Sequence, residues 1–389
     1  MKTIVSRHKA LCENSEPAVI VQAPIVCTLF GAFAEACLGY SLLSCGDLSI
    51  TISVSKRKDN LVKVYKSNGV DKKRFALNAL RFRKEDRWAN YIKGVIAVFI
   101  KEGYKVSGMD FTISGDGLQA DNISLSTSLA TATALALNNL YEFKFSQQAI
   151  VRLVHLANTT FNGETCRVGD LLTVLNGRAK ELVFFDHQHS TYEYVSFPFC
   201  EEGAKYKPIM FDSKVPSQAM IDENLYAHEF TVEAFRKLYS NYKDIPMRDI
   251  PETDITSRII PLDEKYRQVC GYVLRETKLT YDALQQLRAN EPIMYGRLMN
   301  RAQVDLRDKL EVTCPEVDWL TKRASEIEGC KGAKLVFNGN SGAVLVLISE
   351  EALPKYIERL DDYGHIFGFN PTWSMFVPTE GAKILYSIR

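Results

Sequence analysis

The sequence has almost no excess of charge of either sign. Its 48 Lys and Arg residues nearly balance 47 Asp and Glu residues, and the formal net charge is +1. A protein that wraps DNA or RNA needs a strongly basic surface, so we expect no nucleic-acid partner. Internal repeats and low-complexity tracts are also missing. With 46% hydrophobic and 24% charged residues, the composition indicates an ordinary globular protein.

Signals for a cysteine-bound metal and for export are missing too. The nine cysteines include no CxxC pair, which makes a cysteine zinc site improbable. Their odd number and scattered positions favour free thiols in a reducing cytoplasm. Residues 1–16 contain no apolar run long enough for a signal peptide. We interpret His187 and His189 as a solvated pair at a strand end rather than as metal ligands.

One uncharged stretch, Pro17–Ala34, approaches the minimum length of a membrane-spanning helix. Pro24 interrupts it, and β-branched and aromatic residues dominate it. The pattern therefore favours two buried strands, Ala18–Val21 and Ile25–Phe30, with a turn that begins at Gly31. We expect a soluble protein with no membrane partner.

A chain of 389 residues predicts two domains, which we place at 1–200 and 201–389. The hydrophobic periodicity indicates an α+β fold. The expected strands are Leu48–Ser55 and Leu61–Tyr65 (as a hairpin), Val106–Ser114, Ala179–Asp186, Lys334–Val336, Ala343–Ile348 and Ser374–Pro378. The expected helices are Trp88–Lys101, Ser126–Leu140, Ser146–Asn158, Val232–Tyr242, Leu262–Leu274, Tyr281–Arg288, Pro292–Val304 and Leu353–Leu360.

Three segments carry residue types suited to a functional site. Ser124–Ala130 (SLSTSLA) places hydroxyls at the start of a helix, where free backbone N–H groups bind anions or where the hydroxyls merely cap the helix. Asp170 precedes an apolar helix and suits an N-cap, a general base or a partner for a cation. Asn338–Ala343 (NGNSGA) permits either close approach of the backbone to a ligand or a plain hairpin turn.

Taken together, four segments resemble the galactokinases, a branch of the GHMP small-molecule kinases. These segments are Trp88–Ile96 (WANYIKGVI), Tyr295–Asp318 (YGRLMNRAQVDLRDKLEVTCPEVD), Asp212–Val215 (DSKV) and Phe376–Ala382 (FVPTEGA). Their order and spacing agree with that family along most of the chain.

The resemblance implies a two-domain fold and a reaction. The N-terminal domain would be of the ribosomal-S5-like kind and the C-terminal domain ferredoxin-like, with a cleft between them for ATP and sugar. The reaction would transfer the γ-phosphoryl group of ATP, with Mg²⁺, to the anomeric hydroxyl of galactose. Phosphoryl transfer depends on positioning and on charge neutralisation, so the residues at those positions decide what this chain does.

At the first family motif this sequence reads Ala23–Gly39 (APIVCTLFGAFAEACLG). Val26 stands where the family has an arginine that steadies the transferring phosphate. Ala32 and Phe33 replace the Glu and His that hold the sugar hydroxyls. The sugar-binding aspartate becomes Glu35, which is one methylene longer. A hydrophobic side chain cannot supply the charge of a lost guanidinium.

At the phosphate loop the sequence reads Ala120–Ala130 (ADNISLSTSLA). Asn122 and Ser124 occupy positions where glycines let the backbone wrap the phosphates. Ser126, Thr127 and Ser128 keep the hydroxyls, and Ser128 would be the residue that holds Mg²⁺. Side chains at the glycine positions could block this approach or change the shape of the loop.

The resemblance assigns a few further site residues. Asp170, in Cys166–Leu171 (CRVGDL), matches the catalytic aspartate, and Arg167 is new to the pattern. Of the third glycine-rich motif, only Gly339 and Gly342 remain as nucleotide-binding candidates. A sugar-contacting tyrosine of the family falls on Asn224.

These changes predict a galactokinase-like protein with weak or no kinase activity, retained for ligand binding or regulation and open to a protein partner. The alternative is a divergent kinase that acts on galactose or a related small molecule with Mg–ATP. In that case Asp170 would be the base, Glu35 would contact the sugar and Arg167 would replace the lost arginine. A purely structural or oligomeric role is a third possibility.

Overall fold

The computed structural model describes residues 2–69, 71–116, 122–215, 229–240, 246–337 and 342–388. The chain forms two compact units. The first unit comprises Met1–Val26, Cys45–Gly177 and Glu380–Arg389. The second unit comprises Cys27–Ser44 and Arg178–Thr379. Neither unit is one continuous segment, because two long strands near the N-terminus run through both and the C-terminal strand returns to the first. The division into domains at residue 200 stays a prediction.

In the first unit, a sheet has the strand order β12-β1-β2-β5-β3-β4. The β3–β5 pair is parallel, whereas the β1–β12, β2–β5 and β3–β4 pairs are antiparallel. The strands of this sheet are β1 (Val19–Phe30), β2 (Tyr40–Lys56), β3 (Leu61–Lys66), β4 (Lys72–Ala76), β5 (Met109–Ser114) and β12 (Lys383–Ser387).

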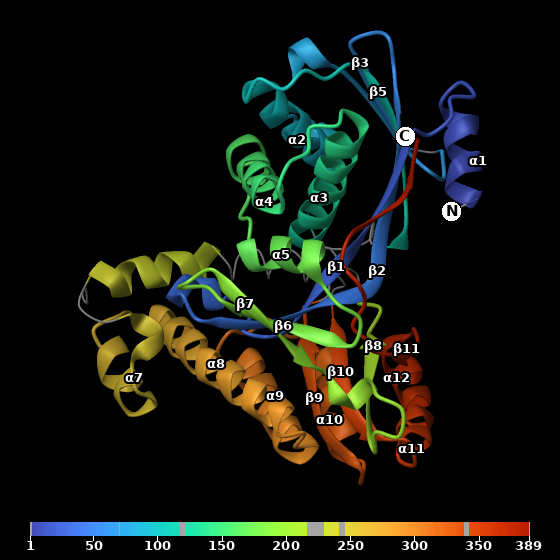
Figure 1. The fold of residues 1–389 in the computed structure, drawn as a ribbon. Coiled ribbons are helices and arrows are strands. Elements are labelled where there is room, and N and C mark those ends of the chain that lie inside the picture. The colour runs from blue at the N-terminus through green and yellow to red at the C-terminus, as the bar shows by residue number, and fades with distance from the viewer. Residues whose placement is uncertain are drawn as a thin grey trace. The chain divides into compact units, whose positions relative to one another are not determined.

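The first unit has helices on both sides of this sheet. Figure 1 shows α2, α3 and α4 on one side of the strands and α1 on the other. The helix bounds are α1 (Lys2–Leu11), α2 (Ala89–Lys101), α3 (Asn122–Leu140), α4 (Gln147–Leu156) and α5 (Val168–Asn176). Helix α3 packs against α2, α4 and α5. The apolar residues of α2 that recur at helical spacing are buried, which explains why the sequence predicts this helix well.

In the second unit, an antiparallel sheet has the order β11-β8-β10-β9. Its strands are β8 (Tyr206–Asp212), β9 (Cys330–Val336), β10 (Ala343–Ser349) and β11 (Thr372–Met375). The start of β2 pairs with β6 (Glu181–Asp186), which pairs with β7 (Thr191–Ser196). The helices are 229–240, α7 (Glu252–Ile259), α8 (Glu264–Arg288), α9 (Pro292–Asp308), α10 (Pro315–Ser325), α11 (Leu353–Glu358) and α12 (Leu360–Phe367).

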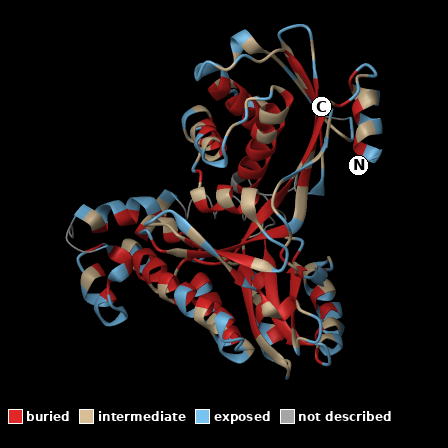
Figure 2. Ribbon diagram, viewed as in Figure 1, coloured by how far each residue is buried: buried red, intermediate tan, exposed pale blue. Residues whose placement is uncertain are grey.

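Buried residues follow the strands and one face of α9, whereas most residues of α2 and α3 are buried (Figure 2). The second unit has two apolar clusters. One contains Phe211, Tyr272 and Tyr356, and it includes Ala32 and Phe33 from the segment after β1. The other contains Phe30, Tyr295 and Met299. The α+β class is confirmed by this mixture of sheets and helices and by the solved structures described below.

Several expectations about the elements are wrong. Ala18–Val21 and Ile25–Phe30 are not two strands but parts of the single strand β1, which continues through Pro24. The strand expected at Ser374–Pro378 is β11, which ends at Met375. Leu48–Ser55 and Leu61–Tyr65 are strands, but they do not form a hairpin, because β5 lies between β2 and β3. Leu262–Leu274 and Tyr281–Arg288 are not separate helices but parts of α8. The polar stretch between them is helical because Glu276, Thr277 and Thr280 point into the interior and are buried there.

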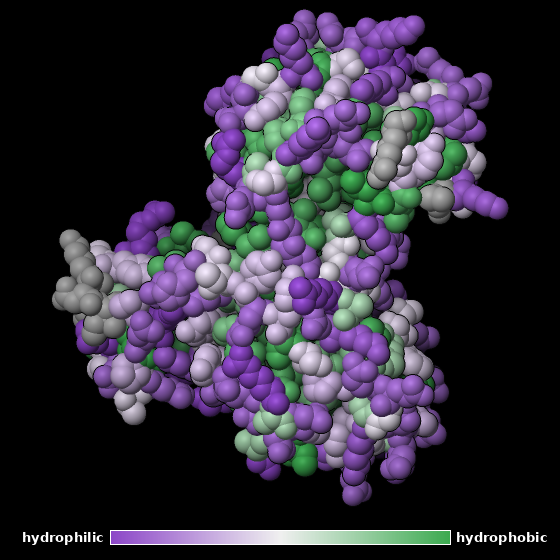
Figure 3. All heavy atoms as spheres, viewed as in Figure 1, coloured by the Kyte–Doolittle hydropathy of each residue, from purple (hydrophilic) through white to green (hydrophobic). Residues whose placement is uncertain are grey.

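Polar residues dominate the visible face of the molecule, and apolar residues gather there in patches (Figure 3). Ile384, Tyr386 and Ile388 are among the exposed large apolar residues, at the C-terminal strand. Pro17–Ala34 forms β1 and a turn, and Gly31 adopts the left-handed conformation expected of that turn. Within the described residues, no helix is both long and apolar enough to cross a membrane.

Candidate active site

Asp170 lies in the first turn of α5 in the first unit, where the helix dipole favours an acidic side chain. It is buried, and the Nη2 atom of Arg167 lies 2.6 Å from its Oδ2 atom. Arg167 is the residue that precedes the helix, and its backbone is extended. The carboxylate that matches the family's catalytic aspartate is therefore held in a buried ion pair with an arginine from its own helix turn.

The hydroxyl-rich segment begins α3, which packs against α5. Ser124, Ser126, Thr127 and Ser128 are all buried there. The Ser128 hydroxyl donates a hydrogen bond to the carbonyl oxygen of Pro24 at 2.7 Å. The side chain of Asn122 lies outside the described residues. The first unit thus holds Asp170 and the hydroxyl segment on two helices in mutual contact, with the Ser128 proton directed at the backbone of β1.

Glu164, just before α5, is a titratable group that the sequence interpretation missed. Burial raises the pKa of Glu164 from its ordinary 4.5 to about 7. The Tyr91 hydroxyl donates to its Oε1 atom at 3.3 Å and opposes this shift. Near neutral pH, Glu164 therefore exchanges a proton only a few residues from Arg167 and Asp170.

We expect Glu164→Gln to stabilise the protein at pH 8 and to have little effect at pH 4. The unfolded chain releases this proton near pH 4.5 but the folded chain only near 7. The contribution of Glu164 to stability is therefore fully present below pH 4.5 and is lost as the pH rises through 7. The gain at pH 8 should be about 1–3 kcal/mol, measured by urea unfolding. Glu85→Gln, at an exposed position, is the control, and an equal gain there would refute the prediction.

Glu35 lies in the second unit, in the short helical turn Ala34–Cys37, and is half-buried. The two residues that flank this turn, Phe33 and Leu38, both adopt left-handed backbone conformations, with φ of 67° and 56°. Such conformations are uncommon for bulky side chains and persist only where the surroundings hold them. The loop 31–39, which matches the family's sugar motif, is therefore a strained turn fixed by its contacts.

Buried polar side chains hold this loop from three other elements. Glu276 of α8 accepts a hydrogen bond from the Gly31 N–H at 2.9 Å. Lys334 of β9 donates to the Leu29 carbonyl at 2.5 Å and lies 3.9 Å from Glu276. Farther along the loop, Thr277 Oγ1 lies 3.2 Å from Cys37 Sγ. Arg248, which precedes α7, donates to the Leu38 carbonyl at 3.4 Å.

The sugar positions of the loop carry apolar side chains that are buried. Ala32 is 4% and Phe33 6% exposed, and both belong to the first apolar cluster of the second unit. The Phe33 ring meets Phe337 edge to face, with the ring centroids 5.8 Å apart. Val26, where the family has arginine, is also buried, in the first unit. These side chains offer no hydrogen-bonding group to a sugar or a phosphate.

Gly342 lies where β9 and β10 are joined as antiparallel neighbours. A Cβ atom at Gly342 would collide with Ser213 Oγ, and its φ is +76°. Packing and backbone conformation therefore account for this glycine, as in the hairpin interpretation. Gly339 and Asn224 lie outside the described residues.

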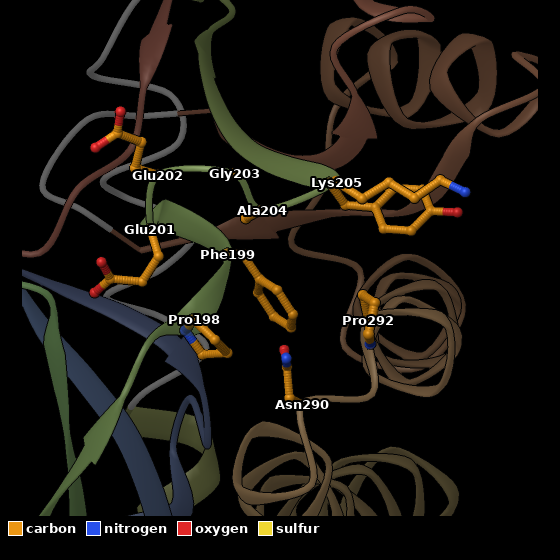
Figure 4. Close-up of a pocket in the computed structure, with 10 residues that line it drawn as sticks. Pro198, Phe199, Glu201, Glu202, Gly203, Ala204, Lys205, Asn290 and Pro292 are labelled. Atoms are coloured by element: carbon orange, nitrogen blue, oxygen red, sulfur yellow. The ribbon is translucent and has the colours of Figure 1, made fainter.

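A cavity of about 460 Å³ in the second unit contains none of the predicted site residues. It lies between the 198–206 segment and the connection from α8 to α9 (Figure 4). Phe199 and Asn290 point toward one another inside it, and Glu201 and Glu202 point away (Figure 4). Its charged lining residues are Glu201, Glu202 and Lys205, and Glu201 also pairs with Lys180 at 3.0 Å.

The histidine pair is only partly as expected. His189 is exposed and its Nδ1 atom lies 2.9 Å from Asp186 Oδ2, as suits a solvated strand end. His187 is instead half-buried, with Nε2 2.8 Å from Ser41 Oγ. Among the residues that the structure describes, no three His, Cys, Asp or Glu side chains form a metal-binding group.

Comparison with known proteins gives a consistent result. The family model "GHMP kinases N terminal domain" matches residues 90–178. A galactokinase of Pyrococcus furiosus is 26% identical over 367 residues, which cover 94% of this chain and 99% of that protein. The crystal structure of Lactococcus lactis galactokinase complexed with galactose superposes with a TM-score of 0.89 at 20% identity, covering 99% of both chains.

A more distant solved structure, the Methanococcus jannaschii mevalonate kinase, superposes with a TM-score of 0.57 at 15% identity and covers 94% of this chain and 99% of that one. These two structures establish the shared fold, and the sequence matches extend along nearly the whole chain. Residues 90–178 therefore match a GHMP kinase N-terminal domain, and the whole chain is similar to galactokinases in sequence and in fold.

Proposed function

We propose that this protein is a galactokinase-like fold with weak or no kinase activity, retained for ligand binding or regulation. One observation carries the proposal. Ala32 and Phe33, at the positions that hold sugar hydroxyls in the family, are buried in the apolar cluster of the second unit. A methyl group and a phenyl ring supply no hydrogen bonds to a sugar, and a sugar that binds there loses those it makes with water.

The phosphate side of the proposed site supports the same conclusion. Val26 supplies no positive charge for a transferring phosphate. The Ser128 hydroxyl proton goes to the Pro24 carbonyl, and the Asp170 carboxylate is paired with Arg167. A carboxylate in a buried ion pair accepts a proton from a substrate less readily, because its charged form is already stabilised.

One contact favours the second candidate, an active divergent sugar kinase. Arg167 brings a guanidinium to Asp170 although the family's arginine is replaced by Val26. In that kinase, Asp170 would accept or orient the proton of the sugar hydroxyl. Glu35 would bind the sugar, Ser126 and Thr127 the phosphates, and Arg167 would neutralise their charge.

Mg–ATP is the cofactor that the family implies for an active protein. Mg²⁺ in such sites usually keeps several waters and phosphate oxygens as ligands, so one or two protein oxygens suffice. Among the described residues, Ser128 is the metal ligand that the resemblance proposes, and its oxygen retains lone pairs while its proton bonds to Pro24. We therefore include a nucleotide among the candidate ligands, and we place the protein in a reducing cytoplasm because all nine cysteines are free.

Titration of galactose by calorimetry tests this proposal. We expect no saturable binding to the full chain at millimolar galactose, with or without Mg–ATP. Saturable binding that Glu35→Gln removes would show that the sugar position is open, which would remove the observation that carries the proposal and favour the active kinase. Asp47→Asn, at an exposed position, is the matched control for loss of one negative charge.

A further inference from the structure

The sheet of the first unit has one polar face. Along β2, the side chains of Thr51, Ser53 and Ser55 alternate with those of Ile52 and Val54, which are completely buried. Because side chains of a strand alternate between the two faces, the hydroxyls share one face. Thr112 and Ser114 on the neighbouring β5 continue it, with Thr51 paired to Ser114 and Ser53 to Thr112.

Helix α1 covers only part of this polar face. His8 places its Nδ1 atom 2.9 Å from Ser53 Oγ and its Nε2 atom 3.0 Å from Ser55 Oγ. Just after the helix, Cys12 Sγ lies 3.6 Å from Thr112 Oγ1. The hydroxyls of Ser53, Ser55 and Thr112 therefore have polar partners on α1 or just after it. Thr51 and Ser114 lie beyond these contacts.

The uncovered part of the face forms a cavity of about 740 Å³. Its floor runs across the sheet in the order β12, β1, β2, β5 and the end of β3. Its wall is the start of α1, where Thr3, Ile4 and Arg7 line it. The polar residues of the floor are Lys383 on β12, Gln22 on β1, Thr51 on β2, Ser114 on β5 and Ser67 just after β3. Such a volume lies within the range typical of small-molecule sites.

The charge of the cavity is of one sign. Arg7 stands on the helix side and Lys383 on the sheet side, and none of the described lining residues carries a carboxylate. The neighbouring Glu380 lies 3.6 Å from Lys383, but the two side chains are 68% and 51% exposed, so this pair is weak. Guanidinium and ammonium groups bind phosphate, and hydroxyl and amide groups bind the hydroxyls of a polyol.

We propose that this cavity binds a small phosphorylated polyol. Arg7 and Lys383 hold the phosphate, while Thr51, Ser114 and Gln22 hydrogen-bond to the polyol hydroxyls. The site lies on the α1 side of the sheet, whereas the helices that bear Asp170 and the hydroxyl segment include α3, on the other side (Figure 1). It therefore does not depend on whether the chain transfers phosphate.

Glucose 6-phosphate is the probe that tests this site, titrated into the full chain by calorimetry. We expect saturable binding with one site per chain, at least tenfold weaker in Arg7→Gln. Inorganic phosphate should bind more weakly than glucose 6-phosphate, and galactose should not bind there. Lys101→Gln, at an exposed position on α2, is the matched control and should leave the affinity unchanged.

A second variant separates a polyol site from a surface that merely attracts anions. Thr51→Val keeps the shape of the side chain and removes its hydroxyl. We expect it to weaken binding of glucose 6-phosphate and not of inorganic phosphate. Absence of saturable binding, or equal affinities in the wild type and Arg7→Gln, would overturn the proposal. Asp170→Ala should bind glucose 6-phosphate as the wild type does. The result for this cavity is therefore independent of any result on kinase activity.

Discussion

Lys334→Met should destabilise the second unit by about 3–5 kcal/mol, the usual cost of removing one partner from a buried ion pair. Lys334 and Glu276 are 2% and 1% exposed, and the pair fixes the segment before the sugar loop. Burial lowers the pKa of Lys334, while the nearby Glu276 raises it. Without the ammonium group, the Glu276 carboxylate and the Leu29 carbonyl would both lose their cationic partner.

Urea unfolding of three variants measures this effect. Lys334→Met should lose the most stability, and the double variant Lys334→Met/Glu276→Gln should lose less, because no uncompensated charge remains. Lys355→Met removes an exposed lysine of α11 and should change stability by less than about 0.5 kcal/mol. A loss below about 1 kcal/mol for Lys334→Met would show that the pair does not hold the loop.

Phe33→Ala should also lower the free energy of unfolding, by about 3–5 kcal/mol, as is typical when a buried phenylalanine is truncated. The Phe33 ring is almost fully buried and packs edge to face on Phe337. Its removal leaves a cavity in a cluster whose other members are fixed by the antiparallel sheet and by helices of the second unit. Because alanine also keeps the left-handed backbone, the variant gains nothing from relief of strain.

The matched control for this variant is Phe82→Ala, since Phe82 is 48% exposed. It should change the free energy of unfolding by less than about 0.5 kcal/mol. Equal, small losses for both variants would mean that Phe33 contributes little to packing. Such a result would remove the main support for the claim that Phe33 fills the position where the family binds the sugar.

Periodicity predicts the local elements where the buried face is apolar. Helix α2 follows directly from its pattern of apolar residues, whereas the pattern of Pro17–Ala34 predicts two strands and not one strand β1 that continues through Pro24. The single helix α8 does not, because Glu276 and Thr277 point inward and break the apolar pattern that defines a buried face. The order of strands is likewise hidden: β5 enters between β2 and β3 from more than forty residues later in the chain.

Some contacts of the candidate site can likewise be predicted from local spacing, and others cannot. The contact of Arg167 with Asp170 follows from their spacing of three residues across a helix start. The contact of Lys334 with Glu276 joins residues far apart in the sequence, and only the fold brings them together. The one signal in the sequence is Lys334 next to the apolar residues Leu335 and Val336 of a strand, which indicates a charge that must find a partner.

Transfer of phosphate to galactose is the measurement that tests the central claim most directly. The full chain, in excess over γ-labelled ATP, is mixed with Mg²⁺ and saturating galactose in a single-turnover assay. Asp170→Ala removes the candidate base, and Asp116→Ala removes an exposed carboxylate as the matched control. We predict no labelled galactose above the level of Asp170→Ala. Labelled galactose that forms rapidly in the wild type and in Asp116→Ala, and not in Asp170→Ala, would contradict the account.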